Sequence, residues 1–257
     1  MNKREASTIA PTVVANDLTL SDLFAVLRSG ARDFAIYPLY GLFFSAFYAV
    51  GGALLLFGLV RLGLGWWMIP AMAGFPIIAP FIAVGMYEVS RRREVGLPLN
   101  WSAVLGALRG KGDDQLILMG GIVFVAFSFW MILAHGIFAI FMGESGISQT
   151  GSELIQSSEA ISMLLVGSVI GGFFALALFA ITVMTLPMLV DKEVDFISAI
   201  IVSLATMRAN RGVMLAWALL IALILFVAML PLFLGLLIAL PVLGHASWHL
   251  YRRVVGS

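Results

Sequence analysis

Long apolar stretches, each near the length that a membrane-crossing helix needs, alternate with short polar segments along most of this sequence. A helix needs about 20 predominantly apolar residues to cross a hydrocarbon core that is roughly 30 Å thick. The composition agrees with such spans, because 61% of the residues are hydrophobic and 11% are charged, whereas soluble domains have roughly 45–50% and about 25%. The sequence therefore predicts an all-α integral membrane protein.

Six membrane spans fit this pattern and give a polytopic transmembrane helical bundle. They cover about residues 36–60, 66–88, 115–142, 161–190, 213–230 and 232–250. The last two come from one apolar stretch of about twice the required length, which we divide near Pro231. All six lie in a single membrane domain, residues 20–253, after a polar N-terminal tail, residues 1–19. The tail lacks the continuous apolar segment of a cleavable signal, so we expect no cleavage.

The Lys and Arg residues predict the orientation of these spans. With the spans placed as above, fourteen of the fifteen cations fall on one side of the membrane, and Arg61 falls on the other. Cytoplasmic loops retain Lys and Arg, so both termini are predicted to be cytoplasmic. The densest group of cations follows the second span and is predicted to fix the topology and to meet lipid headgroups. It consists of Arg91, Arg92, Arg93, Arg109 and Lys111.

Three shorter segments on the cytoplasmic side have apolar residues at helical spacing and predict amphipathic helices at the membrane interface. They cover about residues 21–34, 100–109 and 195–208. Thr19 or Ser21 is placed to cap the first helix, and Asp195 to cap the third. Each segment precedes a predicted pair of spans, which suggests a threefold repeat of one interfacial helix and one helical hairpin.

The polar segment "MYEVSRRREVGLPLNWSAVL" after the second span occurs together with "RSGARDF" near the N-terminus and "LPMLVDKEVDFISAI" after the fourth span. In these segments the chain resembles the bacterial inner-membrane family catalogued as domain of unknown function 2189, over roughly residues 20 to 250. The resemblance implies a multi-pass protein of the bacterial inner (cytoplasmic) membrane. It implies no activity and supplies no catalytic residues.

The histidines are the first candidates for a site. A haem–copper oxidase core needs about six His ligands, and this chain has three His residues. His245 and His249 are four residues apart, so they share one helical face and are weak candidates for binding a cofactor. The neighbouring Trp248 and Tyr251 favour an interface anchor instead. His135 lies well inside the third span, where a polar side chain is a functional candidate or a neutral partner of another helix.

Two further patterns concern helix packing and transport. Gly167, Gly171 and Ala175 recur every four residues and predict a seam where another helix, in this chain or another, approaches closely. The second span contains three prolines, which tend to kink or break a helix. Transporters use broken helices to form binding sites, so a transport function stays open. The three prolines are Pro70, Pro76 and Pro80.

No catalytic motif or metal-ligand cluster stands out, and with no Cys the chain has no thiolate chemistry. A net charge of +1 argues against nucleic acid as a partner. We therefore expect no catalysis, no metal and no cofactor. The leading hypothesis is a non-catalytic organising or accessory component of the membrane, with lipid and a membrane-protein partner or a second copy as contacts. The alternatives are a transporter or channel for a small neutral solute and a haem-binding accessory of a respiratory complex.

Overall fold

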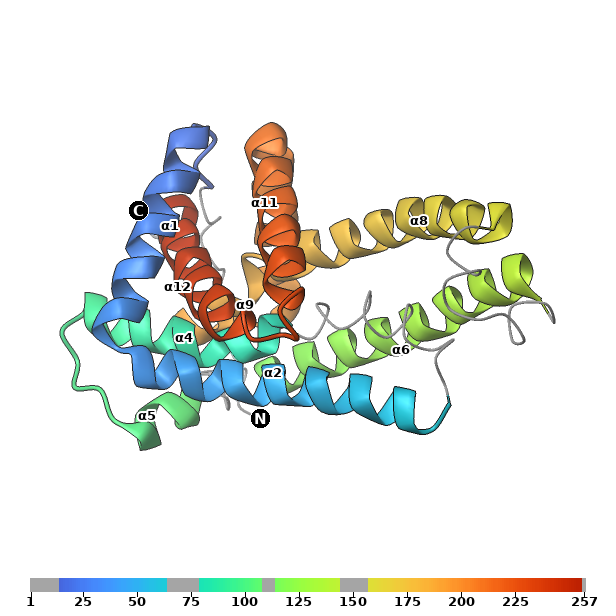
Figure 1. The fold of residues 1–257 in the computed structure, drawn as a ribbon. Helices are drawn as coiled ribbons and strands as arrows, with labels where there is room; N and C mark the ends of the chain where they lie inside the picture. The colour runs from blue at the N-terminus through green and yellow to red at the C-terminus, as the bar shows by residue number, and fades with distance from the viewer. Residues whose placement is uncertain (1–13, 64–78, 108–113, 144–156, 256–257) are drawn as a thin grey trace, which may run out of the picture.

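The computed structural model describes residues 14–63, 79–107, 114–143 and 157–255, and every regular element in these residues is a helix (Figure 1). The helices are α1 (Leu20–Ile36), α2 (Pro38–Arg61), α4 (Ala79–Glu94), α5 (Trp101–Gly106), α6 (Gln115–Met142), α8 (Ser158–Thr182), α9 (Thr185–Asp191), α10 (Phe196–Ala209), α11 (Arg211–Met229) and α12 (Leu236–Val255). The predicted all-α class is confirmed.

Local capping explains where several helices begin. Thr19 accepts a hydrogen bond from the backbone N–H of Asp22, and the Asp22 side chain accepts one from the Thr19 backbone. Asn100 caps α5 and Asp195 caps α10 in the same way, each through a backbone N–H three residues later. These bonds satisfy donors that the first turn of a helix leaves free. Helices thus form at all three segments predicted to be amphipathic, although residues 108 and 109 lie outside the described residues.

Helix α12 is the centre of the molecule and packs against α1, α2, α4, α9 and α11. Gly30 lies where α1 approaches this helix closely. A Cβ atom added to this glycine would lie 2.5 Å from the carbonyl oxygen of Val242 and 2.6 Å from the backbone nitrogen of Ala246. Only a glycine leaves room for two backbones at this separation. The first and last described helices are therefore in direct contact.

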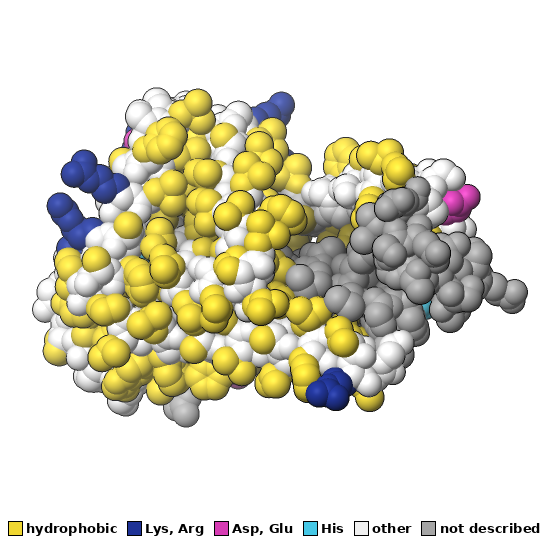
Figure 2. Space-filling model, in the orientation of Figure 1, with side chains coloured by type: hydrophobic (Ala, Val, Ile, Leu, Met, Phe, Trp, Pro, Cys, Tyr) yellow, Lys and Arg dark blue, Asp and Glu magenta, His cyan; other side chains and the backbone are white. Residues whose placement is uncertain are grey.

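Four helical segments are long and apolar enough to cross a membrane: Pro38–Arg61, Gln115–Met142, Ser158–Asp191, which comprises α8 and α9, and Arg211–Met229. They correspond to the first, third, fourth and fifth predicted spans. Hydrophobic side chains are spread over the described part of the face seen in Figure 2, and the Lys and Arg side chains lie at its edges. The chain is thus an integral membrane protein by composition and by surface.

The six predicted spans are not all confirmed. Most of the predicted span 66–88, including Pro70 and Pro76, lies outside the described residues. The predicted span 232–250 falls on α12, which is not among the four candidates because its C-terminal half carries histidines and arginines, and which is largely buried by other helices. In Figure 1, α2, α6 and α8 run across the view, whereas α11 and α12 stand across them. A membrane normal along the first three helices would run across α11.

The predicted threefold repeat is not confirmed either. A short helix followed by longer helices does recur along the chain, but the long helices differ in environment. Helix α8 is largely exposed and packs mainly against α6, whereas α12 is enclosed by five other helices. The predicted break at Pro231 falls in the turn between α11 and α12.

Candidate functional site

Asp33 is the most deeply buried charged residue in the part of the chain that the structure describes, with 1% of its surface exposed. It lies on the face of α1 that also buries Leu23, Val26 and Gly30. A carboxylate on such a face is costly unless other groups pair with it. The surroundings of Asp33 therefore define the candidate site.

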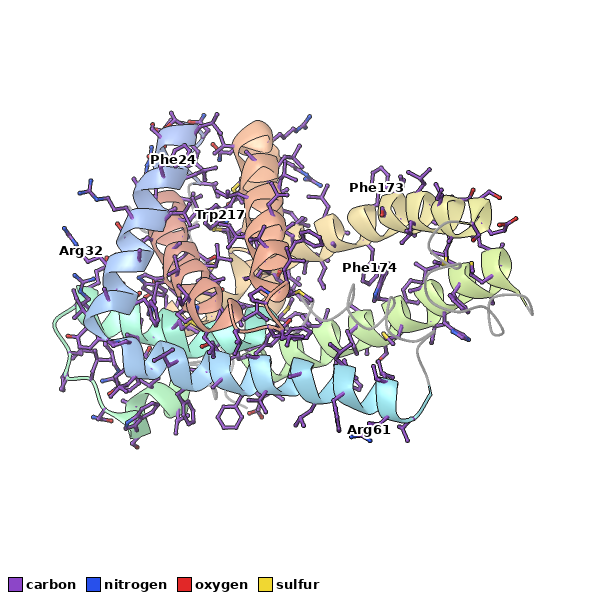
Figure 3. The ribbon with its side chains drawn as sticks, viewed as in Figure 1. Phe24, Arg32, Arg61, Phe173, Phe174 and Trp217 are labelled. Atoms are coloured by element: carbon purple, nitrogen blue, oxygen red, sulfur yellow. The ribbon has the colours of Figure 1, made fainter. Side chains whose placement is uncertain are left out.

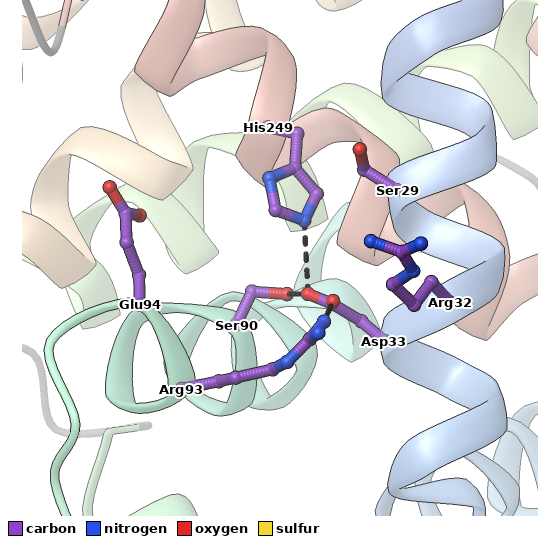
Figure 4. A pocket seen from close by; sticks show the side chains of 7 residues that line it. All are labelled: Ser29, Arg32, Asp33, Ser90, Arg93, Glu94 and His249. Atoms are coloured by element: carbon purple, nitrogen blue, oxygen red, sulfur yellow. Dashed lines mark hydrogen bonds and ion pairs between the residues drawn. The ribbon is translucent and has the colours of Figure 1, made fainter.

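Three side chains from two other helices contact the Asp33 carboxylate (Figure 4). Ser90 of α4 donates a hydrogen bond to Oδ2 at 2.5 Å, and His249 of α12 donates one to the same oxygen at 3.0 Å. Arg93 of α4 forms a salt bridge with Oδ1. The charge is thus compensated by one cation and two hydrogen-bond donors, and α1, α4 and α12 meet at one carboxylate.

Ser90 also contacts His245, with 2.8 Å between Oγ and Nδ1. A serine hydroxyl has one proton, and that proton points to Asp33, so His245 must donate its Nδ1–H to Ser90. His245 in this tautomer cannot remove a proton from Ser90. The arrangement of serine, histidine and aspartate therefore orients three helices and does not produce an activated nucleophile.

A cavity of about 290 Å³ lies beside this cluster. It is lined by Ser29, Arg32, Asp33, Ser90, Arg93, Glu94 and His249. Both acidic groups are paired, Asp33 as above and Glu94 with Arg252 at 2.9 Å. Figure 4 shows the Arg32 guanidinium beside the cluster. The cavity is polar and has cations and anions in equal number.

A second polar network extends the cluster toward α9. Glu94 accepts hydrogen bonds from Trp248 and Arg252, and Asp191 accepts one from the Tyr251 hydroxyl at 2.9 Å. Burial raises the pKa of Tyr251, so its hydroxyl stays protonated and remains a donor. Together these contacts fix the end of α12 to α4 and α9.

The predicted headgroup-anchoring cations have different environments. Arg91 and Arg92 each bond Glu88, at 2.7 and 2.6 Å, which matches the expected pairing three and four residues apart. Hydrogen bonding to Glu88 raises the pKa of Arg91. Arg93 is drawn inward to Asp33 instead. Arg109 and Lys111 lie outside the described residues, and lipid contact stays a prediction for all five.

The histidines proposed as cofactor ligands are both engaged within the chain. His245 is fully buried against Ser90, and His249 bonds Asp33. The two imidazoles therefore do not face one open site, and their surroundings do not fit a haem. Among the described residues, no group of three His, Asp or Glu side chains could hold a metal ion. His135 lies on α6 with its ring stacked on Phe138, 6.4 Å between centroids.

The glycines of the predicted small-residue seam lie against α6, whereas its alanine does not. A Cβ at Gly171 would lie 2.7 Å from the Trp130 ring of α6, and one at Gly167 would lie 3.9 Å from Ile137. Gly171 thus lets α6 approach α8 within the chain, whereas Gly167 has room for a methyl group. Ala175 lines a separate apolar cavity.

Sequence reasoning missed Asp33, although a signal for it was present. Asp33 follows Leu23, Val26 and Gly30 at intervals of three, four and three residues, so it continues the apolar face of its helix. A carboxylate in that series indicates a buried partner. Nothing in the sequence indicates that the partners are Ser90 and His249, which are 57 and 216 residues away.

Residues 68–191 match the model of DUF2189, a family described as a predicted integral membrane protein. Over these residues the chain is similar to this family. The DUF2189 region contains Ser90, Arg93 and Glu94 of the polar cluster, whereas Asp33 and His249 lie outside it. Neither the curated proteins nor the solved structures contain a match to the chain.

Proposed function

We propose that this protein is a non-catalytic membrane component that organises or assists other membrane components. The observation that carries the proposal is the pairing of the polar groups around Asp33 with one another. Asp33, Ser90, Glu94 and His249 join helices, and the serine among them is a hydrogen-bond donor rather than a nucleophile. A cluster of this kind fixes the arrangement of the helices. Contacts with other membrane components are then made by the outer surface of the protein.

Helix α1 offers the surface best suited to a partner. Leu20, Phe24, Arg28 and Arg32 are four residues apart, so they form one stripe along α1, opposite the face that packs on α12. Phe24 is 70% exposed, and Figure 3 shows it near the outer end of α1, with Arg32 further along. Aromatic and Arg side chains are enriched in protein interfaces. This stripe is our proposed contact with a membrane-protein partner.

The distribution of Arg residues supports a cytoplasmic location for this stripe. Arg32 and Arg61 lie at opposite sides of the molecule in Figure 3, as expected if α1 is cytoplasmic and the end of α2 is not. We place the protein in the bacterial inner membrane with both termini in the cytoplasm. The stripe would then face partners at the cytoplasmic surface.

Purification of the tagged protein from its own host in mild detergent tests the proposal. We expect a membrane protein to co-purify in stoichiometric amount, and Phe24→Ser to reduce its recovery severalfold. Phe124→Ser is the matched control, because Phe124 on the apolar span α6 is also 70% exposed. That variant should retain the partner.

Two results would contradict the proposal. If the wild-type protein is recovered without a stoichiometric partner, the organising role is wrong. If both variants recover equally less of the partner, α1 is not the contact. An absorbance spectrum of the same sample checks the haem alternative, which requires a Soret band.

A further inference from the structure

A second cavity, of about 460 Å³, lies between α4, α8, α11 and α12. Its wall on α8 and α11 includes exposed residues such as Gly172, Ala175 and Leu219. Its wall on α4 and α12 consists of buried residues such as Met86 and Leu243. The cavity therefore runs from the apolar outer surface to a floor deep in the molecule.

Two residues of that floor carry hydroxyl groups. Tyr87 on α4 is 5% exposed, Ser247 on α12 is 9% exposed, and both line the cavity. Neither hydroxyl makes a hydrogen bond within the part of the chain that the structure describes, and neither oxygen is fully enclosed by protein atoms. Thr182, the other hydroxyl of the lining, donates to its own helix at Leu178 at 2.8 Å. The Tyr87 and Ser247 donors can therefore bind an acceptor inside the cavity.

The size and chemistry of the cavity fit a ligand. Small-molecule sites are usually apolar cavities of roughly 300–1,000 Å³ with a few polar groups, and an apolar cavity of about 150 Å³ already binds benzene. The lining contains no charged residue. A charged group buried there would lack a counter-ion, so the ligand must be neutral.

We propose that this cavity binds a neutral, apolar molecule whose carbonyl group accepts hydrogen bonds from Tyr87 and Ser247. A carbonyl oxygen has two lone pairs and can accept from both donors. The carbonyl lies at the floor, and the hydrocarbon part extends past Gly172 and Leu219 into the lipid. In a membrane this chemistry occurs in lipid-soluble quinones and in the ester groups of uncharged glycerolipids. The site is separate from the Asp33 cluster and does not depend on the partner proposed for α1.

Calorimetric titration of the full-length protein in detergent micelles tests this site. Three probes are used at equal micelle concentration: a decyl-substituted benzoquinone, dioctanoylglycerol and decylbenzene, which lacks a carbonyl. We expect saturable binding of the quinone or the glycerol ester at one site per chain. Binding of the quinone alone, or of the ester alone, identifies the source of the carbonyl. Decylbenzene should bind more weakly.

Variants that remove one hydroxyl connect the binding to the two donors. Tyr87→Phe and Ser247→Ala should each weaken the carbonyl probe roughly two- to tenfold, as expected for one hydrogen bond, and should leave decylbenzene unchanged. Tyr40→Phe and Ser128→Ala are matched controls outside the cavity and should bind as the wild type does. Ala218→Phe places a ring in the cavity and should abolish binding of every probe.

The proposal fails if neither carbonyl probe saturates on the wild type. It also fails if Tyr87→Phe and Ser247→Ala bind the carbonyl probe as tightly as the wild type, or if decylbenzene binds equally well. The two hydroxyl variants preserve side-chain shape, so they decide the question even if Ala218→Phe does not fold.

Discussion

A carboxylate removed from water needs compensating partners, and Asp33 has three of them from two other helices. A buried ion pair adds little net stability when both partners are present, because desolvation offsets the attraction. Loss of one partner is different, since it leaves an uncompensated charge in the interior. The Asp33 cluster therefore mainly restricts how α1, α4 and α12 can pack together.

Replacement of Asp33 by Asn measures how much the paired carboxylate contributes to the unfolding free energy. Asp33→Asn keeps the size of the side chain but leaves Arg93 and His249 facing a neutral group. We expect a loss of roughly 2–4 kcal/mol in unfolding free energy, below the value for a fully buried pair because Arg93 is partly exposed. Thermal unfolding in detergent reports the change. Asp17→Asn breaks the exposed pair with Arg253 and should unfold as the wild type does, and a similar loss in both variants would contradict the role of burial.

At the scale of elements, the helices can be predicted from the sequence but several of their environments cannot. Capping residues and apolar periodicity are local signals, and Thr19 and Asp195 begin helices as expected. The burial of α12 depends on α1 and α4, which are distant in sequence. Apolar residues that contact lipid and those that contact other helices look alike, so the sequence predicts a span over residues 232–250.

Gly30 provides the test at this scale. Gly30→Ala would place a methyl group against the backbone of α12, whose Val242 oxygen is 2.5 Å from the Cβ position. We expect a loss of about 1–3 kcal/mol from overpacking. Gly51→Ala is the control, because no heavy atom lies within 4 Å of that position among the described residues and Ala favours a helix by about 1 kcal/mol. Unfolding in a series of denaturant concentrations separates a loss at Gly30 from a gain at Gly51, and equal shifts would contradict the close contact.

At the scale of the whole molecule, the charge distribution is readable from the sequence and the directions of the helices are not. Arg32 and Arg61 lie on opposite sides of the molecule (Figure 3), and the proposed topology, which depends only on which segments carry cations, assigns them to opposite sides of the membrane. This topology assumes that every apolar helix runs along the membrane normal. Helix α11 is itself one of the four candidate spans but stands across α2, α6 and α8 (Figure 1). It packs against α12 and α10.

Labelling of single cysteines tests the proposed orientation, and the chain suits the method because it has no Cys of its own. Arg28 and Leu62 are exposed residues at opposite sides of the predicted membrane. In intact cells, a membrane-impermeant maleimide should label Leu62→Cys at the cell exterior. It should label Arg28→Cys only after the inner membrane is permeabilised. The reverse pattern would invert the topology.

The residues of the Asp33 cluster are synthesised at widely separated times, so the cluster is completed late in translation. Helix α1 emerges from the ribosome first, α4 follows about 50 residues later, and α12 comes some 200 residues after α1. In the growing chain Asp33 can meet Ser90 and Arg93 while His249 does not yet exist. Its final donor arrives with the same helix that packs against Gly30. A chain that ends before α12 would therefore lack the His249 donor, and its Asp33 carboxylate would not be shielded by that helix.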